Sequence, residues 1–178
     1  MFEQPFEVVV PASTANLGPG FDSIGMALNL FTRVRVEPAD ETRLFLHGAT
    51  LRGLPQNEHN LIFHAIKTCF ERINRSLPAL HLHVWSEIPL TRGLGSSAAA
   101  LAAGLVAANF LLGRVYSEDD LLQIGTAYEG HPDNIGASLL GGVVIGSWDG
   151  HRAAVVKVDP PPIGVLVAIP SFELSTDK

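Results

Sequence analysis

The chain has 178 residues, of which 47% are hydrophobic and 17% are charged, and its formal net charge at pH 7 is −6. A chain of this length can build one sizeable core, and its negative charge argues against a general nucleic-acid-binding protein. The single cysteine, Cys69, excludes an internal disulfide and a cysteine-ligated zinc site. Because charged residues usually make up about 25% of a globular chain, part of the surface is expected to meet a partner.

No stretch of the sequence predicts a secretion signal or a membrane span. The first residues lack a basic region followed by an apolar run. Residues 97–112 carry no charge, but this run is shorter than the roughly 20 residues needed to cross a bilayer. The run is more typical of a buried helix, and we predict a cytoplasmic protein that binds neither membrane nor nucleic acid.

The first half of the chain predicts three strands followed by a helix. The strands are expected over residues 6–10, 26–36 and 42–47, where apolar residues cluster or alternate. Residues 11–20 have the composition of a loop, rich in glycine, proline and short polar side chains. Residues 60–74 predict a helix because apolar residues recur there with helical period on one face.

The second half predicts a buried helix among shorter elements. Residues 96–112 are apolar on every side, so we expect a central helix that ends before Gly113. Ser117 and Asp120 have the spacing of a capping box, which predicts a helix over residues 117–128. The other expected elements are strands over residues 80–85, 143–148, 153–158 and 163–169 and a short helix that ends at Leu140.

A glycine-rich loop at residues 89–99 leads into the apolar helix. Gly93 and Gly95 permit positive φ angles and a close approach of the backbone to a ligand. The first N–H groups of a helix lack intrahelical partners and lie at the positive end of its dipole, so a phosphate fits there. The loop lacks the lysine of a Walker A motif. Its spacing alone leaves open a second interpretation, a tight turn in which Ser96 or Ser97 caps the helix.

Two polar loops hold the other candidate site residues. The first spans residues 13–22, and the second spans residues 129–134. Each has a purely structural alternative. The first can consist of turns closed by Asn, Asp, Ser and Thr side chains, and in the second Asn134 can be an N-cap while His131 lies near the preceding helix end.

Together these three motifs resemble those of the GHMP kinases and, within that family, of the homoserine kinases. Residues 89–99 are similar to the phosphate-binding motif of the family, and residues 11–27 resemble the N-terminal motif of the homoserine kinases. His131-Pro132-Asp133-Asn134, with the later Gly141-Gly142, resembles their His-Pro-Asp-Asn motif. The resemblance implies an α+β fold of the ribosomal-protein-like, two-layer type, with helices on a mixed and mostly antiparallel sheet.

The resemblance also implies an activity, the ATP-dependent phosphorylation of the side-chain hydroxyl of L-homoserine to O-phospho-L-homoserine in threonine biosynthesis. Asp22 is expected to pair with the ammonium of homoserine, while Asn16, His131 and Asn134 surround its hydroxyl. Asn60 is expected near the nucleoside, and Mg²⁺ on Ser97 and Glu129. The residues expected around the ATP phosphates are Pro89, Leu90, Thr91, Arg92, Gly93, Leu94, Gly95, Ser96, Ser97, Ala98 and Ala99.

The catalytic base is left unassigned. Related kinases use an aspartate where this sequence has Asn134, and because an amide cannot accept the proton, the phosphate or solvent is expected to take it. Two other functions stay open at this point. One is another small-molecule kinase of the GHMP family, and the other is a non-catalytic nucleotide-binding or assembly module.

The resemblance divides the chain into two parts. Residues 1–159 are expected to form the N-terminal ATP-binding domain, and residues 160–178 to begin a C-terminal domain that is truncated here. We therefore expect a fragment with reduced or no activity. The face left by the missing domain is expected to be exposed and apolar, which favours a homodimer or other association through it.

Overall fold

The computed structural model describes residues 4–160 and 162–168. Its strands are β1 (Phe6–Ala15), β2 (Ile24–Pro38), β3 (Arg43–His47), β4 (Leu80–Ser86), β5 (Val143–Trp148) and β6 (Ala153–Val158). Its helices are α1 (Leu61–Arg72), α2 (Ser96–Leu111), α3 (Glu118–Glu129) and α4 (Asp133–Leu140), with a 3-10 turn, η1 (Ala49–Leu51).

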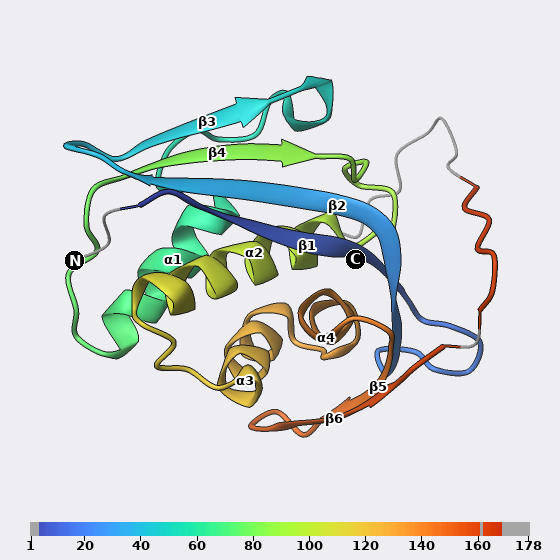
Figure 1. Ribbon diagram of the computed structural model, residues 1–178. Helices are drawn as coiled ribbons and strands as arrows, with labels where there is room; N and C mark the ends of the chain where they lie inside the picture. Colours follow the sequence, from blue (N-terminus) through green and yellow to red (C-terminus); the bar gives the residue numbers. More distant parts are fainter. Residues whose placement is uncertain (1–3, 161, 169–178) are drawn as a thin grey trace.

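The described strands form one mixed sheet in the order β3-β4-β2-β5-β6, and β1 pairs with β2. Only β3 and β4 run parallel, while the other pairs are antiparallel. Figure 1 shows the helices on one side of β1, β2, β3 and β4, with the β5–β6 hairpin curling under α3 and α4. This arrangement confirms the predicted α+β fold with a mostly antiparallel sheet.

The long strand β2 bends, and it connects the β3–β4 part of the sheet to the β5–β6 hairpin (Figure 1). Its residues 32–38 pair with β4, whereas its first three residues pair with β5. At the bend, a Cβ on Gly25 would lie 2.2 Å from the backbone oxygen of Asp133. Only glycine therefore lets the start of α4 approach β2 this closely.

The prediction of a loop over residues 11–20 was wrong for its first half, because β1 continues to Ala15. The strand pairs with β2 as far as Ala15 opposite Gly25, and its register shifts between Pro11 and Ala12. A bulge at this point accommodates proline, which has no N–H to donate to the ladder. Pairing with β2 thus overrides the turn-like composition, and it places Ser13 on a strand.

The apolar helix α2 is the centre of the core, as predicted. It packs against α1, α3, α4, β1 and β2, and nine of its residues are buried. Close packing of α1 on α2 requires Gly104, because a Cβ there would lie 2.5 Å from the backbone oxygen of Ile62. Cys69 of α1 is buried in this core, and burial raises the pKa of its thiol to about 11. It is a core residue, as expected.

The local signals of the second half were mostly reliable. The capping box of α3 is present, with the Ser117 hydroxyl accepting from the Asp120 N–H and the Asp120 carboxylate accepting from the Ser117 N–H. The strand predicted over residues 163–169 was wrong over residues 163–168, which belong to no strand; residue 169 lies outside the described residues.

No helix in the described ranges has the length and hydrophobicity that a bilayer crossing requires.

Candidate functional site

The glycine-rich loop presents the first turn of α2 without a side-chain cap. Thr91, Gly93 and Gly95 all have positive φ angles, between 56° and 68°. Gly95 is the N-cap residue, and among the described residues no side chain accepts a hydrogen bond from the first N–H groups of α2 at this cap. The alternative in which Ser96 or Ser97 caps the helix was therefore wrong. The amides at this helix start are available to an anion.

The loop rests directly on strand β1. The backbone N–H of Ser13 donates to the Leu94 oxygen at 3.2 Å. A Cβ on Gly95 would lie 2.1 Å from Ser13 Oγ, so no larger residue fits between the loop and the strand. The position of the amides at the start of α2 is thus set by β1.

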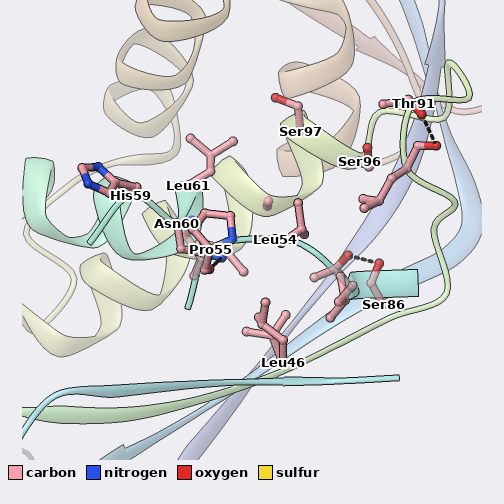
Figure 2. Close-up of a pocket in the computed structure, with 16 residues that line it drawn as sticks. Leu46, Leu54, Pro55, His59, Asn60, Leu61, Ser86, Thr91, Ser96 and Ser97 are labelled. Carbon is pink, nitrogen blue, oxygen red and sulfur yellow. Dashed lines mark hydrogen bonds between the residues drawn. The ribbon is translucent and has the colours of Figure 1, made fainter. Parts of the chain in front are cut away.

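A cavity of about 340 Å³ lies beside the loop. Figure 2 shows it between the start of α1, the segment that follows η1, and the start of α2, with Leu46 of β3 on the opposite side. Its walls are mostly apolar, with Leu54, Pro55 and Leu61 on one side and Ser96 on the other. A pocket with apolar walls and a few polar groups suits the flat base of a nucleotide next to an anion site.

Asn60 lines this cavity, as expected for a residue near a nucleoside. Both ends of its side-chain amide form hydrogen bonds within the protein. Its Oδ1 caps α1 by accepting from the Ile62 N–H, and its Nδ2 donates to the Pro55 oxygen at 2.9 Å. Asn60 therefore holds the cavity wall in place.

The two residues expected to hold a metal ion are in contact. Ser97 Oγ donates to Glu129 Oε1 at 2.8 Å, which joins the start of α2 to the end of α3. The described residues contain no group of three or more His, Cys, Asp or Glu side chains that could bind a metal. A cation at this point would need further oxygens from phosphate and water, which is the coordination that Mg²⁺ prefers. The residues present fit Mg²⁺ in that role.

His131 forms a pair with a buried aspartate. Its Nδ1 donates to Asp133 Oδ1 at 2.6 Å, and Asp133 is only 1% exposed. This hydrogen bond is the main cause that raises the pKa of His131, whereas desolvation lowers that pKa. The negative charges of Asp133, Glu129 and Asp22 also raise the pKa of His131. Asp133 thus orients the imidazole, a role to which the sequence pattern did not point.

Asn134 lies inside α4, not at its N-cap. Pro132 occupies the N-cap position without a side-chain bond, so the capping alternative for Asn134 was wrong. The backbone N–H of Asn134 donates to Asp133 Oδ1 at 2.7 Å. The side-chain Oδ1 of Asn134 accepts from Ser13 Oγ at 2.9 Å. Ser13 had no predicted role, because no signal in the sequence pairs residues 121 positions apart.

The loop at residues 16–22 has the structural feature that its composition suggested. Asn16 Oδ1 accepts from the Asp22 N–H at 2.8 Å, and both residues have positive φ angles. Asp22 is exposed, and its charge acts on His131. Ser13 contacts Leu94 and Asn134, and Ser97 contacts Glu129, so the three motifs lie together.

The comparisons with known proteins agree with this geometry. Residues 60–142 match the family model described as "GHMP kinases N terminal domain". A homoserine kinase of Deinococcus radiodurans is 46% identical over 176 residues, which is 98% of this chain and 57% of that protein. A homoserine kinase of Bacillus velezensis is 45% identical over 174 residues, again 98% of this chain and 56% of that protein.

Solved structures show the same fold. The crystal structure of homoserine kinase from Cytophaga hutchinsonii matches with a TM-score of 0.74 and 30% identity, over 90% of this chain and 55% of that one. The mevalonate kinase of Methanococcus jannaschii matches with a TM-score of 0.66 at 17% identity, over 88% of this chain and 56% of that one, which shows the fold alone. The chain spans a little over half the length of the curated relatives it matches. Its fold is that of the N-terminal domain of the GHMP kinases, and residues 60–142 match the model of that domain.

Proposed function

We propose that this chain is the ATP-binding part of a kinase that transfers the γ-phosphoryl group of ATP to the side-chain hydroxyl of L-homoserine, giving O-phospho-L-homoserine. ATP is the phosphoryl donor expected of the family, and the acceptor is taken from the names of relatives at 46% and 45% identity. The observation that carries the proposal is the Ser97–Glu129 hydrogen bond. It joins the phosphate-binding loop to the loop of His131.

On the donor side, the free amides at the start of α2 bind the phosphates, and the neighbouring cavity takes the nucleoside. Ser97 and Glu129 would hold Mg²⁺, which when bound neutralises charge on the phosphates. The chain itself supplies orientation through Gly95, which seats the loop on β1. Phosphoryl transfer has a loose transition state, so positioning and charge neutralisation contribute more than covalent chemistry.

On the acceptor side, the exposed carboxylate of Asp22 pairs with the ammonium of homoserine. His131 and Asn134 surround the hydroxyl, and each is held by a buried partner on its inner side. Asn16 closes the Asp22 loop, and its Nδ2 is the end that can reach a ligand, because its Oδ1 already accepts from Asp22. No residue is assigned as base.

Three related expectations stay predictions. Residues 1–159 are proposed as the N-terminal ATP-binding domain and residues 160–178 as the beginning of the next domain. A cytoplasmic location likewise stays a prediction. Association as a homodimer is proposed through the exposed apolar side chains of β5 and β6, such as Ile145 and Val156.

Calorimetry with Mg²⁺ and a non-hydrolysable ATP analogue tests the proposal. We expect L-homoserine to bind only when the nucleotide is present, and Asp22→Asn to weaken its affinity at least about tenfold, because a charge-assisted bond is lost. The exposed Asp40, in the β2–β3 loop, provides the matched control Asp40→Asn, which should change nothing.

The outcomes of this titration separate the alternatives. Binding of mevalonate or galactose in place of homoserine would indicate another GHMP small-molecule kinase. Nucleotide binding without any acceptor would indicate a non-catalytic module and overturn the proposal.

A further inference from the structure

Ser13 is a buried hydroxyl at the place where the two halves of the site meet. It has no solvent exposure and lies on β1, between the phosphate-binding loop and α4. Its backbone N–H donates to Leu94 of the loop, and its Oγ donates to the side chain of Asn134 in α4. One residue thus contacts both the donor side and the acceptor side of the site.

The hydrogen bonds around Ser13 have a defined direction. A hydroxyl has one proton to donate, and Ser13 gives it to Asn134 Oδ1 at 2.9 Å. Ser13 Oγ in turn accepts from Ser138 Oγ at 3.3 Å, and Ser138 is 3% exposed. With Oδ1 directed at Ser13, the Nδ2 N–H groups of Asn134 are the donors that the amide can offer to a ligand.

Ser13 packs closely against Gly95 of the loop. The space that a Cβ on Gly95 would need is filled by Ser13, whose oxygen and nitrogen atoms lie within 3.1 Å of that position. The same side chain that orients Asn134 therefore also determines where the phosphate-binding amides begin. A shift of Ser13 would move the acceptor group relative to the phosphates.

We propose that Ser13 is a positioning residue for the acceptor alcohol. It holds Asn134 so that Nδ2 donates to the hydroxyl oxygen of the substrate, at a fixed separation from the phosphate-binding loop. This inference rests on the proposed function, and the ligand it concerns is a small primary alcohol. Loss of the Ser13 hydroxyl leaves Asn134 Oδ1 without its inner partner, so the amide is free to turn.

A double-mutant cycle tests whether Ser13 acts through Asn134. The affinity for L-homoserine is measured by calorimetry with Mg²⁺ and a non-hydrolysable ATP analogue, for the wild type, Ser13→Ala, Asn134→Ala and the double variant. We expect Ser13→Ala to weaken binding about tenfold, and to have no further effect when Asn134 is already alanine. Equal effects of Ser13→Ala in both backgrounds would overturn the inference.

Ser138→Ala is the matched control. Ser138 is also buried, and its hydroxyl donates to Ser13 Oγ and not to the side chain of Asn134. We expect it to leave homoserine affinity within about twofold of the wild type, because Ser13 still donates to Asn134. A loss as large as that of Ser13→Ala would show that general disturbance of the buried cluster explains the effect, which would contradict the inference.

A second measurement does not need substrate. The side-chain amide resonances of Asn134 in the ligand-free protein should shift or broaden in Ser13→Ala and stay unchanged in Ser138→Ala. If the wild type binds no homoserine, the proposed function fails, while this measurement still decides the orientation of Asn134. Unchanged Asn134 resonances in Ser13→Ala would overturn the inference whether or not homoserine binds.

Discussion

The proposed phosphate-binding side of the site and the proposed acceptor side are built in different ways. The first consists of backbone amides at the start of α2, which follow one another in the sequence. The second consists of side chains from two segments more than a hundred residues apart, of which His131 and Asn134 are oriented by buried partners. This contrast indicates that neighbouring residues determine the conformation of the first side, although β1 sets its position, whereas the second side depends on how β1 and α4 pack. Four substitutions test this contrast.

Gly95→Ala should have the largest effect, because it disturbs both sides at once. The new Cβ would meet Ser13 at 2.1 Å, and the residue has φ 65°. We expect a loss of about 3 kcal/mol in the free energy of unfolding, measured by urea denaturation. The control is Gly93→Ala, because Gly93 has φ 68° and no neighbour within 4 Å in the described chain. It should lower the free energy of unfolding by only about 1 kcal/mol, through the strained backbone conformation. Equal losses would mean that contact with Ser13 is unimportant.

Glu129→Gln should weaken the binding of ATP in the presence of Mg²⁺ about tenfold, or about 1.4 kcal/mol. The amide keeps a similar shape and can still bond to Ser97, but it removes the charge beside the expected cation. Calorimetry with and without Mg²⁺ separates the two contributions. Glu71→Gln, on the exposed side of α1, is the control and should have no effect. An equal loss without Mg²⁺ would contradict a metal role for Glu129.

Asp133→Asn should lower the pKa of His131, because the bond to Asp133 is the main cause that raises it. A raised folded-state pKa means that the protonated imidazole stabilises the fold. This contribution is complete below the usual pKa of about 6.5, and it is lost as the pH rises through the folded-state value. NMR titration of His131 and unfolding free energies across this range should both show the change. Asp149→Asn, in the β5–β6 turn, should leave the His131 titration unaltered.

Asn16→Gly should have the smallest effect, about 0.5–1 kcal/mol on the free energy of unfolding. Glycine accepts the φ of 60° without strain, so the loss reports the bond from the Asp22 N–H to Asn16 Oδ1. Asn74→Gly, at φ 55° after α1, is matched in backbone conformation and should be nearly neutral. If both variants behave alike in urea denaturation, the Asn16 side chain contributes nothing to the loop.

Much of the fold could be predicted because its signals are local. The capping box at Ser117 and the helix over α2, which is apolar on every side, depend on residues close together in the sequence. Both were confirmed. The strand over residues 11–15 was missed because its turn-like composition gives way to pairing with β2. The expected strand over residues 163–168 was wrong, since apolar residues alone do not provide a neighbouring strand to pair with.

The amino-acid sequence by itself determined the glycine-rich turn before α2 and the resemblance to the GHMP kinases, because both depend on residues that follow one another in the chain. Only the tertiary structure decided that Glu129 meets Ser97, that Asp133 orients His131, and that Ser13 reaches Asn134. The last of these contacts joins residues 121 positions apart. It exists because β1 and α4 both pack against the central helix α2. No local pattern of residues predicts this packing.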